Sequence, residues 1–234
     1  RRYPAGRCLF LEPRPTYLFC YSPIVVPRPD DWPDFAHVTG YWFLDAPEGW
    51  QPPRALVEFL EAGAPPVCVG FGSMLSDQAG RIAHIVLDAL AQAEQRGILV
   101  SGWGAIRADD LPKDVFQIES IPLDWLYPQV LAAVHHGGAG TTASALRAGI
   151  PSVVITFALD QPFWGRQVRR LGVGPEPIPI RRLTADRLAG AIKIAASDAK
   201  MRALATSTGD SIRREDGVGN AVEIVERVVA LSRL

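Results

Sequence analysis

The sequence has few cysteines, and their arrangement argues against a metal site or a disulfide framework. Only Cys8, Cys20 and Cys68 occur in 234 residues, an odd number with no CxxC spacing. All three lie in or beside apolar segments, which is typical of reduced structural thiols in a cytoplasmic protein. We therefore expect a cytoplasmic protein with no zinc or redox role for its cysteines.

An excess of charge of either sign is also lacking. Lys and Arg number 24 against 25 Asp and Glu, a net charge of -1. Such a chain has no basic field that could hold a polynucleotide by counterion release. Long apolar runs are missing too, since the longest, residues 150–159, falls short of the ~20 residues that a membrane span needs. We expect neither a nucleic-acid partner nor a membrane span.

The first residues carry no targeting signal. The chain opens on Arg1-Arg2-Tyr3-Pro4, without a starting methionine and without a charged-then-apolar leader. We expect no signal peptide. The missing methionine favours a numbering that begins inside a longer protein.

Proline is unevenly distributed and divides the chain. Ten of the 20 prolines fall within residues 1–53, which precludes a helical domain there. One strand-like run, residues 16–21, precedes an extended connector that passes through residues 37–42. We interpret residues 1–52 as a terminal strand with its connector, and residues 53–234 as a compact domain.

From residue 53 onward, apolar runs of strand length alternate with segments of helix length. The runs are nearly continuous rather than alternating, which is typical of parallel strands covered by helices on both faces. The sequence predicts an α/β fold, a Rossmann-like doubly wound parallel sheet with a helical C-terminus. Strands are expected at residues 67–71, 97–101, 115–118, 132–135 and 152–156. Helices are expected at residues 53–61, 77–95, 123–127, 142–148, 185–196, 198–206 and 220–234, with Thr184 and Ser197 capping those at 185–196 and 198–206.

The most informative segment is HHGGAGTT, residues 135–142, between a buried apolar run and a helix-compatible run. Strand, glycine-rich turn and helix in this order aim the backbone N–H groups of the first helical turn at the contents of the turn. Small residues let an anion approach the backbone, Thr141 and Thr142 add hydroxyl donors, and an imidazole stands at the mouth. The segment predicts a site for a nucleotide diphosphate.

The two histidines of this segment have different expected roles. Strand alternation lets only one of His135 and His136 face the ligand, which leaves the other as a core or supporting residue. No third His, Cys or carboxylate has ligand spacing nearby, so the pair does not suggest a metal site.

Residues after the other predicted strands are expected at the same edge of the sheet. Ser73 could offer a hydroxyl to a phosphate, although a purely structural glycine turn explains its surroundings equally well. Trp103 stands between two glycines and could present its ring to a base, or it could close one end of the core. Ile121 precedes Pro122, so its extended backbone could read a pyrimidine edge, or the segment could be a plain proline turn.

An acid and an amide, Asp160 and Gln161, follow the fifth predicted strand. A carboxylate accepts from two hydroxyls while an amide both donates and accepts, so the pair can hold vicinal hydroxyls of a sugar. Alternatively, Asp160 caps the next helix. Its position one strand beyond the phosphate turn favours the sugar.

Taken together, these motifs resemble the carboxyl-terminal, donor-binding half of GT-B nucleotide-sugar glycosyltransferases. They look most like the group that holds sterol 3-beta-glucosyltransferases and the transferases that decorate glycopeptide and polyketide antibiotics. The resemblance covers roughly residues 16–232. Its matching pieces are HVTGYWFLD (37–45), VCVGFGSM (67–74), SGWGAI (101–106), IPLDWLYP (121–128) and the long run VHHGGAGTTASALRAGIPSVVITFALDQPFWGRQVRRLGVG (134–174).

The resemblance implies a role for each matching residue and no bound metal. Related plant enzymes place a ribose-binding glutamate where this chain has Ala143, so the ribose contact stays open. The implied contacts are to the diphosphate from Ser73, His135, Gly138, Gly140 and Thr141, to the base from Trp103 and Ile121, and to the sugar from Asp160 and Gln161.

The resemblance also implies a reaction: inverting transfer of a hexose, glucose from UDP-glucose, to a hydroxyl of a sterol, lipid or natural product, with no cofactor beyond the nucleotide sugar. In this family the general base belongs to an amino-terminal domain. Residues 1–52 resemble the remnant of that domain with the interdomain linker, and residues 53–234 the donor-binding domain. The chain alone is therefore expected to bind nucleotide sugar but to transfer it poorly.

Three rival interpretations remain. A nicotinamide-dependent oxidoreductase is disfavoured because the third glycine of its fingerprint would fall at Leu75, and no acidic residue ends the second strand. A non-catalytic nucleotide-sugar-binding module, or half of a two-chain enzyme, fits the same residues. A GT-B nucleotide-sugar epimerase shares the architecture, but the Asp160–Gln161 pair favours transfer.

Overall fold

The fold is taken from a computed structural model that describes residues 15–74, 79–102 and 110–231. The chain divides into two compact units. The first unit combines residues 1–42 with residues 212–234, and the second unit comprises residues 43–211. No helix in the described ranges is long and apolar enough to cross a membrane.

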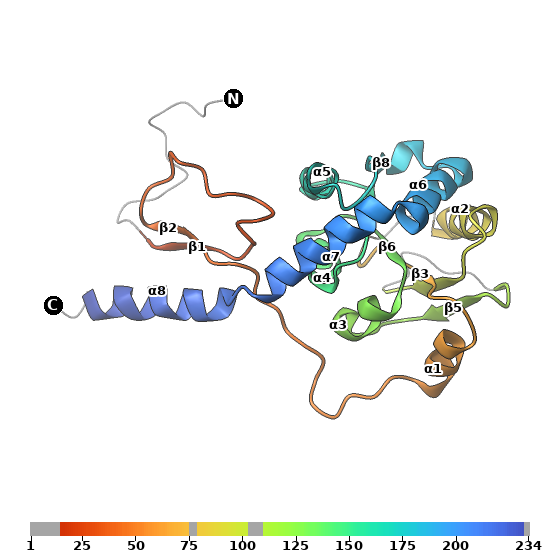
Figure 1. Cartoon of the computed structure of the whole chain (residues 1–234), viewed down its shortest axis with the longest axis horizontal. Coiled ribbons are helices and arrows are strands. Elements are labelled where there is room, and N and C mark those ends of the chain that lie inside the picture. Colours follow the sequence, from red (N-terminus) through yellow and green to blue (C-terminus); the bar gives the residue numbers. More distant parts are fainter. Residues whose placement is uncertain (1–14, 75–78, 103–109, 232–234) are drawn as a thin grey trace. The chain divides into compact units, whose positions relative to one another are not determined.

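The second unit is built on a six-stranded, all-parallel sheet with the order β5-β4-β3-β6-β7-β8. Strands β3, β5, β6 and β8 of this sheet are labelled in Figure 1. This order reverses between β3 and β6, and ligands of such sheets bind in the crevice beyond the strand ends at that reversal. The predicted doubly wound sheet is confirmed. Its strands are β3 (Val67–Gly70), β4 (Gly97–Val100), β5 (Val115–Ile118), β6 (Ala132–His135), β7 (Ser152–Thr156) and β8 (Ile178–Pro179), of which β8 was not expected.

Helices cover both faces of this sheet, which explains why its strands are continuously apolar. Successive residues of β3 point to opposite faces. Val67 and Val69 belong to the core under α2 (Ala79–Gln92) and α6 (Ala185–Ser197). Cys68 belongs to the core under α1 (Arg54–Glu61), α3 (Leu123–Leu126) and α4 (Ala139–Ala148).

The remaining helices of this part are α5 (Gln161–Leu171), which was not predicted, and α7 (Ala199–Arg213), with 3₁₀ turns at Tyr127–Gln129 and Ile180–Arg182. Thr184 caps α6 as expected, since its side chain accepts from the backbone of Arg187 at 3.3 Å. The predicted Ser197 cap of α7 is wrong. Ser197 is still in α6, and its hydroxyl donates back to the Lys193 carbonyl at 2.7 Å. Asp198 caps α7 instead, accepting from the Met201 amide at 3.0 Å.

The first unit pairs two short parallel strands, β1 (Tyr17–Phe19) and β2 (Ala36–Val38), and adds α8 (Gly217–Leu231). The Arg28 guanidinium holds the loop between the strands by donating to the carbonyls of Trp32, Pro33 and Ala36 at 2.7, 3.0 and 3.1 Å. Strand β2 lies where we expected only an extended connector. Because the backbone of residues 40–41 approaches Gly217 so closely, any side chain at Gly217 would overlap it.

Candidate functional site

Three loops of the second unit meet beyond the carboxyl ends of β3, β6 and β7. A side chain at Gly72 would lie 3.1 Å from the ring of His136, so the loop after β3 lies against the turn after β6. The Gln161 amide donates to the Met74 sulfur at 3.1 Å, which joins the loop after β3 to the start of α5. Residues predicted from separate motifs therefore gather at the point where the strand order reverses.

The loops after β4 and β5 extend this edge on the other side of β3. A Cβ atom at Gly102 would lie 2.7 Å from the Gly72 carbonyl, so these two loops touch. No hydrogen bond within the described ranges engages the backbone N–H or C=O of Ile121. With neighbouring strands ~4.8 Å apart, β5 lies about 14 Å from β6, a span that suits a base at one end and a diphosphate at the other. Trp103 lies outside the described residues.

The start of α4 has the geometry of an anion site. Its N-cap residue, Gly138, makes no side-chain cap, so the first-turn N–H groups are left for solvent or a ligand. A Cβ atom at Gly140 would meet nothing within 4 Å, so this face of the first turn is open. Thr141 is half-buried beside it, and Ser73 is exposed in the loop after β3.

His135 is a buried, neutral hydrogen-bond donor. Its side chain is 0% exposed, and its Nδ1 accepts from the Gly137 amide at 3.1 Å. Burial, helped by the adjacent His136, lowers the pKa of His135 to about 3. Because a neutral imidazole that accepts through Nδ1 carries its proton on Nε2, the second nitrogen is a donor. That Nε2 atom is buried without a partner among the described residues.

His136 also lies at the site, which strand alternation did not predict. Its half-buried ring packs against Gly72 and Gly138, and a side chain at Gly138 would overlap it. Burial lowers the pKa of His136, and the carboxylate of Asp160 opposes that effect. Gly138 thus makes room for the His136 imidazole. The sequence predicts that Gly138 and Gly140 both admit the diphosphate, but only Gly140 of these two has open space beside it.

Asp160 and Gln161 lie together after β7, but their polar groups are partly engaged. The exposed Asp160 carboxylate accepts from Trp164 Nε1 at 2.7 Å and makes no cap to the α5 backbone. Gln161 is 2% exposed, and its side-chain oxygen accepts from the amides of Phe157 and Ala158 at 2.6 and 3.0 Å. Among the described residues, its amide nitrogen donates only to the Met74 sulfur, a weak acceptor. That nitrogen is therefore the group of Gln161 best placed to exchange partners.

Two residues at the site were missed by the sequence analysis: Met74 holds Gln161 and Trp164 holds Asp160. Thr142, expected to offer its hydroxyl to the ligand, has that hydroxyl buried without a partner within the described ranges. Of the two missed residues, only the contact of Trp164 could have been predicted from the sequence. Trp164 follows Asp160 by four residues, or one helical turn, so a predicted helix at α5 would have placed the two side chains on the same face.

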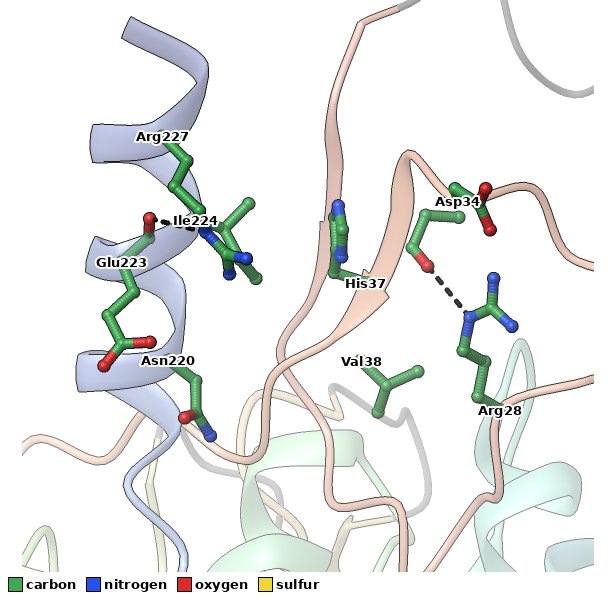
Figure 2. A pocket seen from close by; sticks show the side chains of 9 residues that line it. Arg28, Asp34, His37, Val38, Asn220, Glu223, Ile224 and Arg227 are labelled. Carbon is green, nitrogen blue, oxygen red and sulfur yellow. Dashed lines mark hydrogen bonds between the residues drawn. The ribbon is translucent and has the colours of Figure 1, made fainter. Parts of the chain in front are cut away.

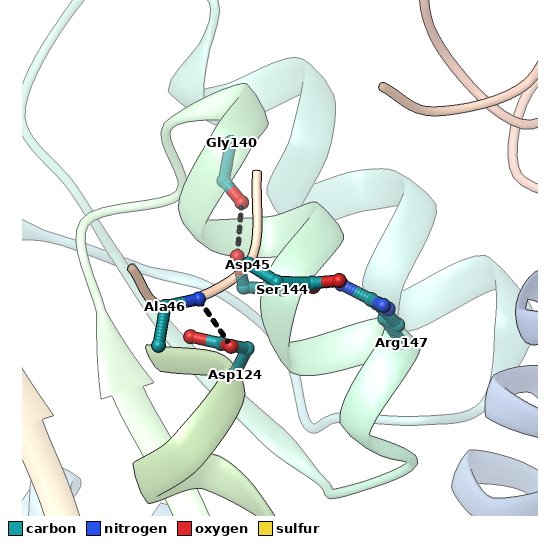
Figure 3. A network of polar contacts seen from close by, with 6 residues as sticks. All are labelled: Asp45, Ala46, Asp124, Gly140, Ser144 and Arg147. Carbon is teal, nitrogen blue, oxygen red and sulfur yellow. Dashed lines mark hydrogen bonds and ion pairs between the residues drawn. The ribbon is translucent and has the colours of Figure 1, made fainter. Parts of the chain in front are cut away.

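The segment that enters the second unit is fastened to α3 and α4 (Figure 3). Asp45 accepts from Arg147 at 2.5 Å, and the Ala46 amide donates to Asp124 at 2.8 Å. The Arg147 hydrogen bond holds the pKa of the Asp45 carboxyl below its usual range. The Arg147 guanidinium also lies 4.5 Å from the centre of the Phe43 ring. Residues 43–46 are thus anchored to α3 and to α4, the helix whose first turn is the candidate anion site.

A cavity of about 470 Å³ lies in the first unit, between β2 and α8 (Figure 2). It contains none of the predicted site residues. Arg28 on its wall is occupied by backbone carbonyls, and Arg227 donates to the Glu223 carbonyl at 3.3 Å. Burial and these two cations lower the pKa of His37 there. We therefore place the candidate site at the sheet edge of the second unit. Among the described residues, no group of three His, Cys, Asp or Glu side chains is arranged to hold a metal ion.

The buried neutral His135 predicts a loss of stability in acid. The unfolded chain binds a proton near pH 6.5, while the folded state resists it down to about pH 3. The stability is therefore complete above pH 6.5 and falls as the pH drops from there, by about 1.4 kcal/mol per pH unit for one such group. Urea unfolding at several pH values measures the free energy of unfolding at each pH. Between pH 6 and pH 4 this free energy should fall less steeply with decreasing pH in His135→Asn than in the wild type. Equal slopes in both proteins would contradict a neutral His135.

The second unit therefore has the architecture of the donor-binding half of a GT-B glycosyltransferase. It combines an all-parallel sheet whose order reverses between β3 and β6, an uncapped helix start with a neutral imidazole, and an acid–amide pair one strand away. The chain belongs to the family described as erythromycin biosynthesis protein CIII-like, C-terminal domain, which it matches over residues 84–231.

Relatives of known function bear out the resemblance. A sterol 3-beta-glucosyltransferase of Arabidopsis thaliana is 41% identical over 88% of this chain and 32% of the relative's own length. The O-mycaminosyltylonolide 6-deoxyallosyltransferase of Streptomyces fradiae is 40% identical over 92% of the chain and 50% of its own length. The chain thus spans between a third and a half of these two relatives.

The fold agrees with solved structures. The glycotransferase of kitacinnamycin superimposes with a TM-score of 0.74 at 26% identity, over 91% of this chain and 55% of that one. The calicheamicin glycosyltransferase CalG4 superimposes with a TM-score of 0.68 at 21% identity, over 93% and 53%. The family and the Rossmann-like α/β fold expected from the sequence are therefore confirmed.

Proposed function

We propose that this chain is the donor-binding half of an inverting, metal-independent glycosyltransferase that moves glucose from UDP-glucose to a hydroxyl of a hydrophobic acceptor. The observation that carries the proposal is the uncapped start of α4 together with the unpartnered Nε2 of His135, at the end of the strand that leads into it. Both are donors without acceptors at the edge where such sheets bind ligands. The sterol glucosyltransferases among the relatives support glucose and a sterol-like acceptor.

The diphosphate would lie against the first turn of α4. Backbone N–H groups of Gly138 and Gly140, the Thr141 and Ser73 hydroxyls and His135 Nε2–H would donate to its oxygens. The bond between the anomeric carbon and the diphosphate oxygen breaks while the acceptor oxygen bonds from the opposite face, which inverts the anomeric centre. The helix start and the imidazole would stabilise the charge of the leaving group, the work that a divalent cation does elsewhere.

The other two parts of the donor would lie on either side. The backbone groups of Ile121, which make no hydrogen bond within the described ranges, suit a uracil edge. A contact of Trp103 with the base stays an expectation, since Trp103 lies outside those ranges. Asp160, one strand beyond His135, would accept from sugar hydroxyls through its carboxylate. Gln161 would contribute its amide N–H by giving up the weak contact to Met74.

The acceptor and the general base are assigned to an amino-terminal acceptor domain. The chain spans 32% of the length of the Arabidopsis thaliana relative and 50% of the length of the Streptomyces fradiae relative, which supports a further domain in the working enzyme. The acceptor's proton would pass to a base in that domain, so this chain by itself would bind donor and transfer sugar weakly or not at all. The free thiols of Cys20 and Cys68 are in keeping with a cytoplasmic enzyme.

Calorimetric titration of the chain with UDP, UDP-glucose and TDP-glucose tests the proposal. UDP-glucose is expected to bind, and UDP to bind with comparable affinity because the diphosphate supplies most of the contacts. If TDP-glucose binds more tightly than UDP-glucose, the base of the natural donor is thymine rather than uracil. Absence of heat with all three ligands would refute it.

A non-catalytic nucleotide-sugar-binding module, or one half of a two-chain enzyme, is the second candidate. Slow hydrolysis of UDP-glucose by the full-length protein that carries this chain would favour the transferase, whereas tight binding without hydrolysis or transfer to any hydroxyl acceptor would favour the module.

A further inference from the structure

Leu159 combines two unfavourable features at the edge of the candidate site. Its φ is +58°, in the left-handed region, which among the described non-glycine residues only Glu94 shares. Its side chain is 88% exposed, so no packing within the described part of the chain compensates for that backbone conformation. A branched side chain in this region is a genuine outlier. Strain of this kind persists where the surroundings impose it, and it marks functional segments.

The surroundings of Leu159 do impose it. The backbone N–H of Gln161 donates to the Ala158 carbonyl at 3.3 Å and closes a turn. The first central residue of this turn is Leu159, and the second, Asp160, has φ -82° and ψ -8°. A positive φ at the first central residue followed by these two angles fits a type II′ turn, whose first central position glycine normally occupies. The side-chain oxygen of Gln161 fastens the preceding amides of Phe157 and Ala158. The turn is therefore clamped from one buried side chain, and Leu159 stands at its tip.

We propose that Leu159 is a specificity-determining residue that packs against the apolar body of the acceptor. This inference rests on the proposed function, because Asp160, its neighbour, is there assigned to the sugar that the acceptor attacks. A leucine has no polar atom to offer sugar hydroxyls, which the adjacent acid and amide serve. A fixed, exposed apolar side chain next to the sugar suits a hydrophobic ring system carrying the reacting hydroxyl.

The test is carried out in the full-length protein that carries this chain, with UDP-glucose and the best acceptor from a panel of sterols and polyketide aglycones. Leu159→Gly and Leu159→Asn relieve the strain and remove the apolar side chain. Both are expected to lower kcat/KM for the acceptor by about tenfold or more, mainly through KM, since burial of a leucine side chain is lost. Leu159→Met, which keeps an apolar side chain, should stay close to the wild type. The affinity for UDP-glucose and the rate of its hydrolysis should not change.

Thermal unfolding gives the second readout and Glu94→Gly the matched control. Leu159→Gly and Glu94→Gly should each raise the melting temperature by about 2–4 °C, because both relieve a left-handed residue. Only Leu159→Gly should impair the acceptor. Unchanged acceptor kinetics in Leu159→Gly, or a lowered melting temperature, would overturn the inference while leaving the donor site intact. A wild type that binds no UDP-glucose would overturn the proposed function itself, and with it this inference.

Discussion

Replacing His135 by alanine is expected to weaken the binding of UDP to this chain by about 10- to 150-fold, the range expected for one hydrogen bond to a charged group. The physical reason is that the buried Nε2–H of His135 has no acceptor among the described residues and would donate to the diphosphate. An alanine removes this donor and also leaves the Gly137 amide without its acceptor, so the fold of the variant is checked alongside its affinity. Calorimetry at pH 7.5 measures the change.

Two variants separate this effect from a general loss of structure. His84 is an exposed histidine on α2 that bonds the Gly80 carbonyl in its own helix, so His84→Ala should bind UDP as the wild type does. His135→Gln restores a side-chain N–H and should recover part of the affinity. If His135→Ala is folded and binds UDP with undiminished affinity, His135 does not contact the diphosphate.

Replacing Gly137 by alanine is expected to destabilise the second unit by about 2–4 kcal/mol. Gly137 has φ +82°, and a Cβ atom there would lie 2.7 Å from the Val154 side chain and 3.2 Å from the Gln161 carbonyl. Left-handed strain and overlap with a buried strand therefore add together. Because the overlap also pushes on the start of α5, UDP-glucose affinity should fall as well. Urea unfolding measures the first effect and calorimetry the second.

Gly140→Ala is the contrasting variant in the same turn. Gly140 lies inside α4 with nothing near its missing side chain, so alanine should leave the stability unchanged or raise it by about 0.5–1 kcal/mol. UDP binding should nevertheless weaken, since the added methyl faces the open side of the helix start. If Gly137→Ala unfolds at the same urea concentration as Gly140→Ala, the described geometry of the turn is wrong.

The strands of the sheet could be predicted because buried parallel strands leave a local signature. The runs at 115–118 (VFQI), 132–135 (AAVH) and 152–156 (SVVIT) are mostly apolar, and a polar residue ends or follows each of them. Helix α5 was missed because its sequence QPFWGRQVRRL contains both proline and glycine, although its buried Trp164 and Val168 are spaced one helical turn apart. Pro162 is tolerated in the first turn. Gly165 is required by tertiary packing, since a side chain there would lie 2.9 Å from Pro177.

The short strands were hidden for similar reasons. β2 stands in a proline-rich segment and exists because β1 pairs with it, and β8 has two residues, one of them Pro179. Neither pairing leaves a pattern within its own few residues. Strands of this length are therefore predictable only once the neighbouring strand is known.

At the site, the positions of the residues were predictable but the state of their polar groups was not. Residues after parallel strands meet at one edge, so Ser73, His135 and Asp160 could be placed from the strand pattern. The side-chain oxygen of Gln161 accepts from the amides of Phe157 and Ala158 in its own loop, and these contacts form only in the folded chain. His136 escaped the alternation argument because it lies just past the end of β6, where the strand geometry no longer holds.

The central claim is that the start of α4, with His135, holds a nucleotide diphosphate. Titration of isotopically labelled chain with UDP, followed by amide NMR, tests it most directly. The account predicts that the largest shifts fall on the amides of residues 137–141, with smaller ones at Ser73 and Ile121. Shifts confined to the first unit, around β2 and α8, or no saturable shift at all, would contradict it.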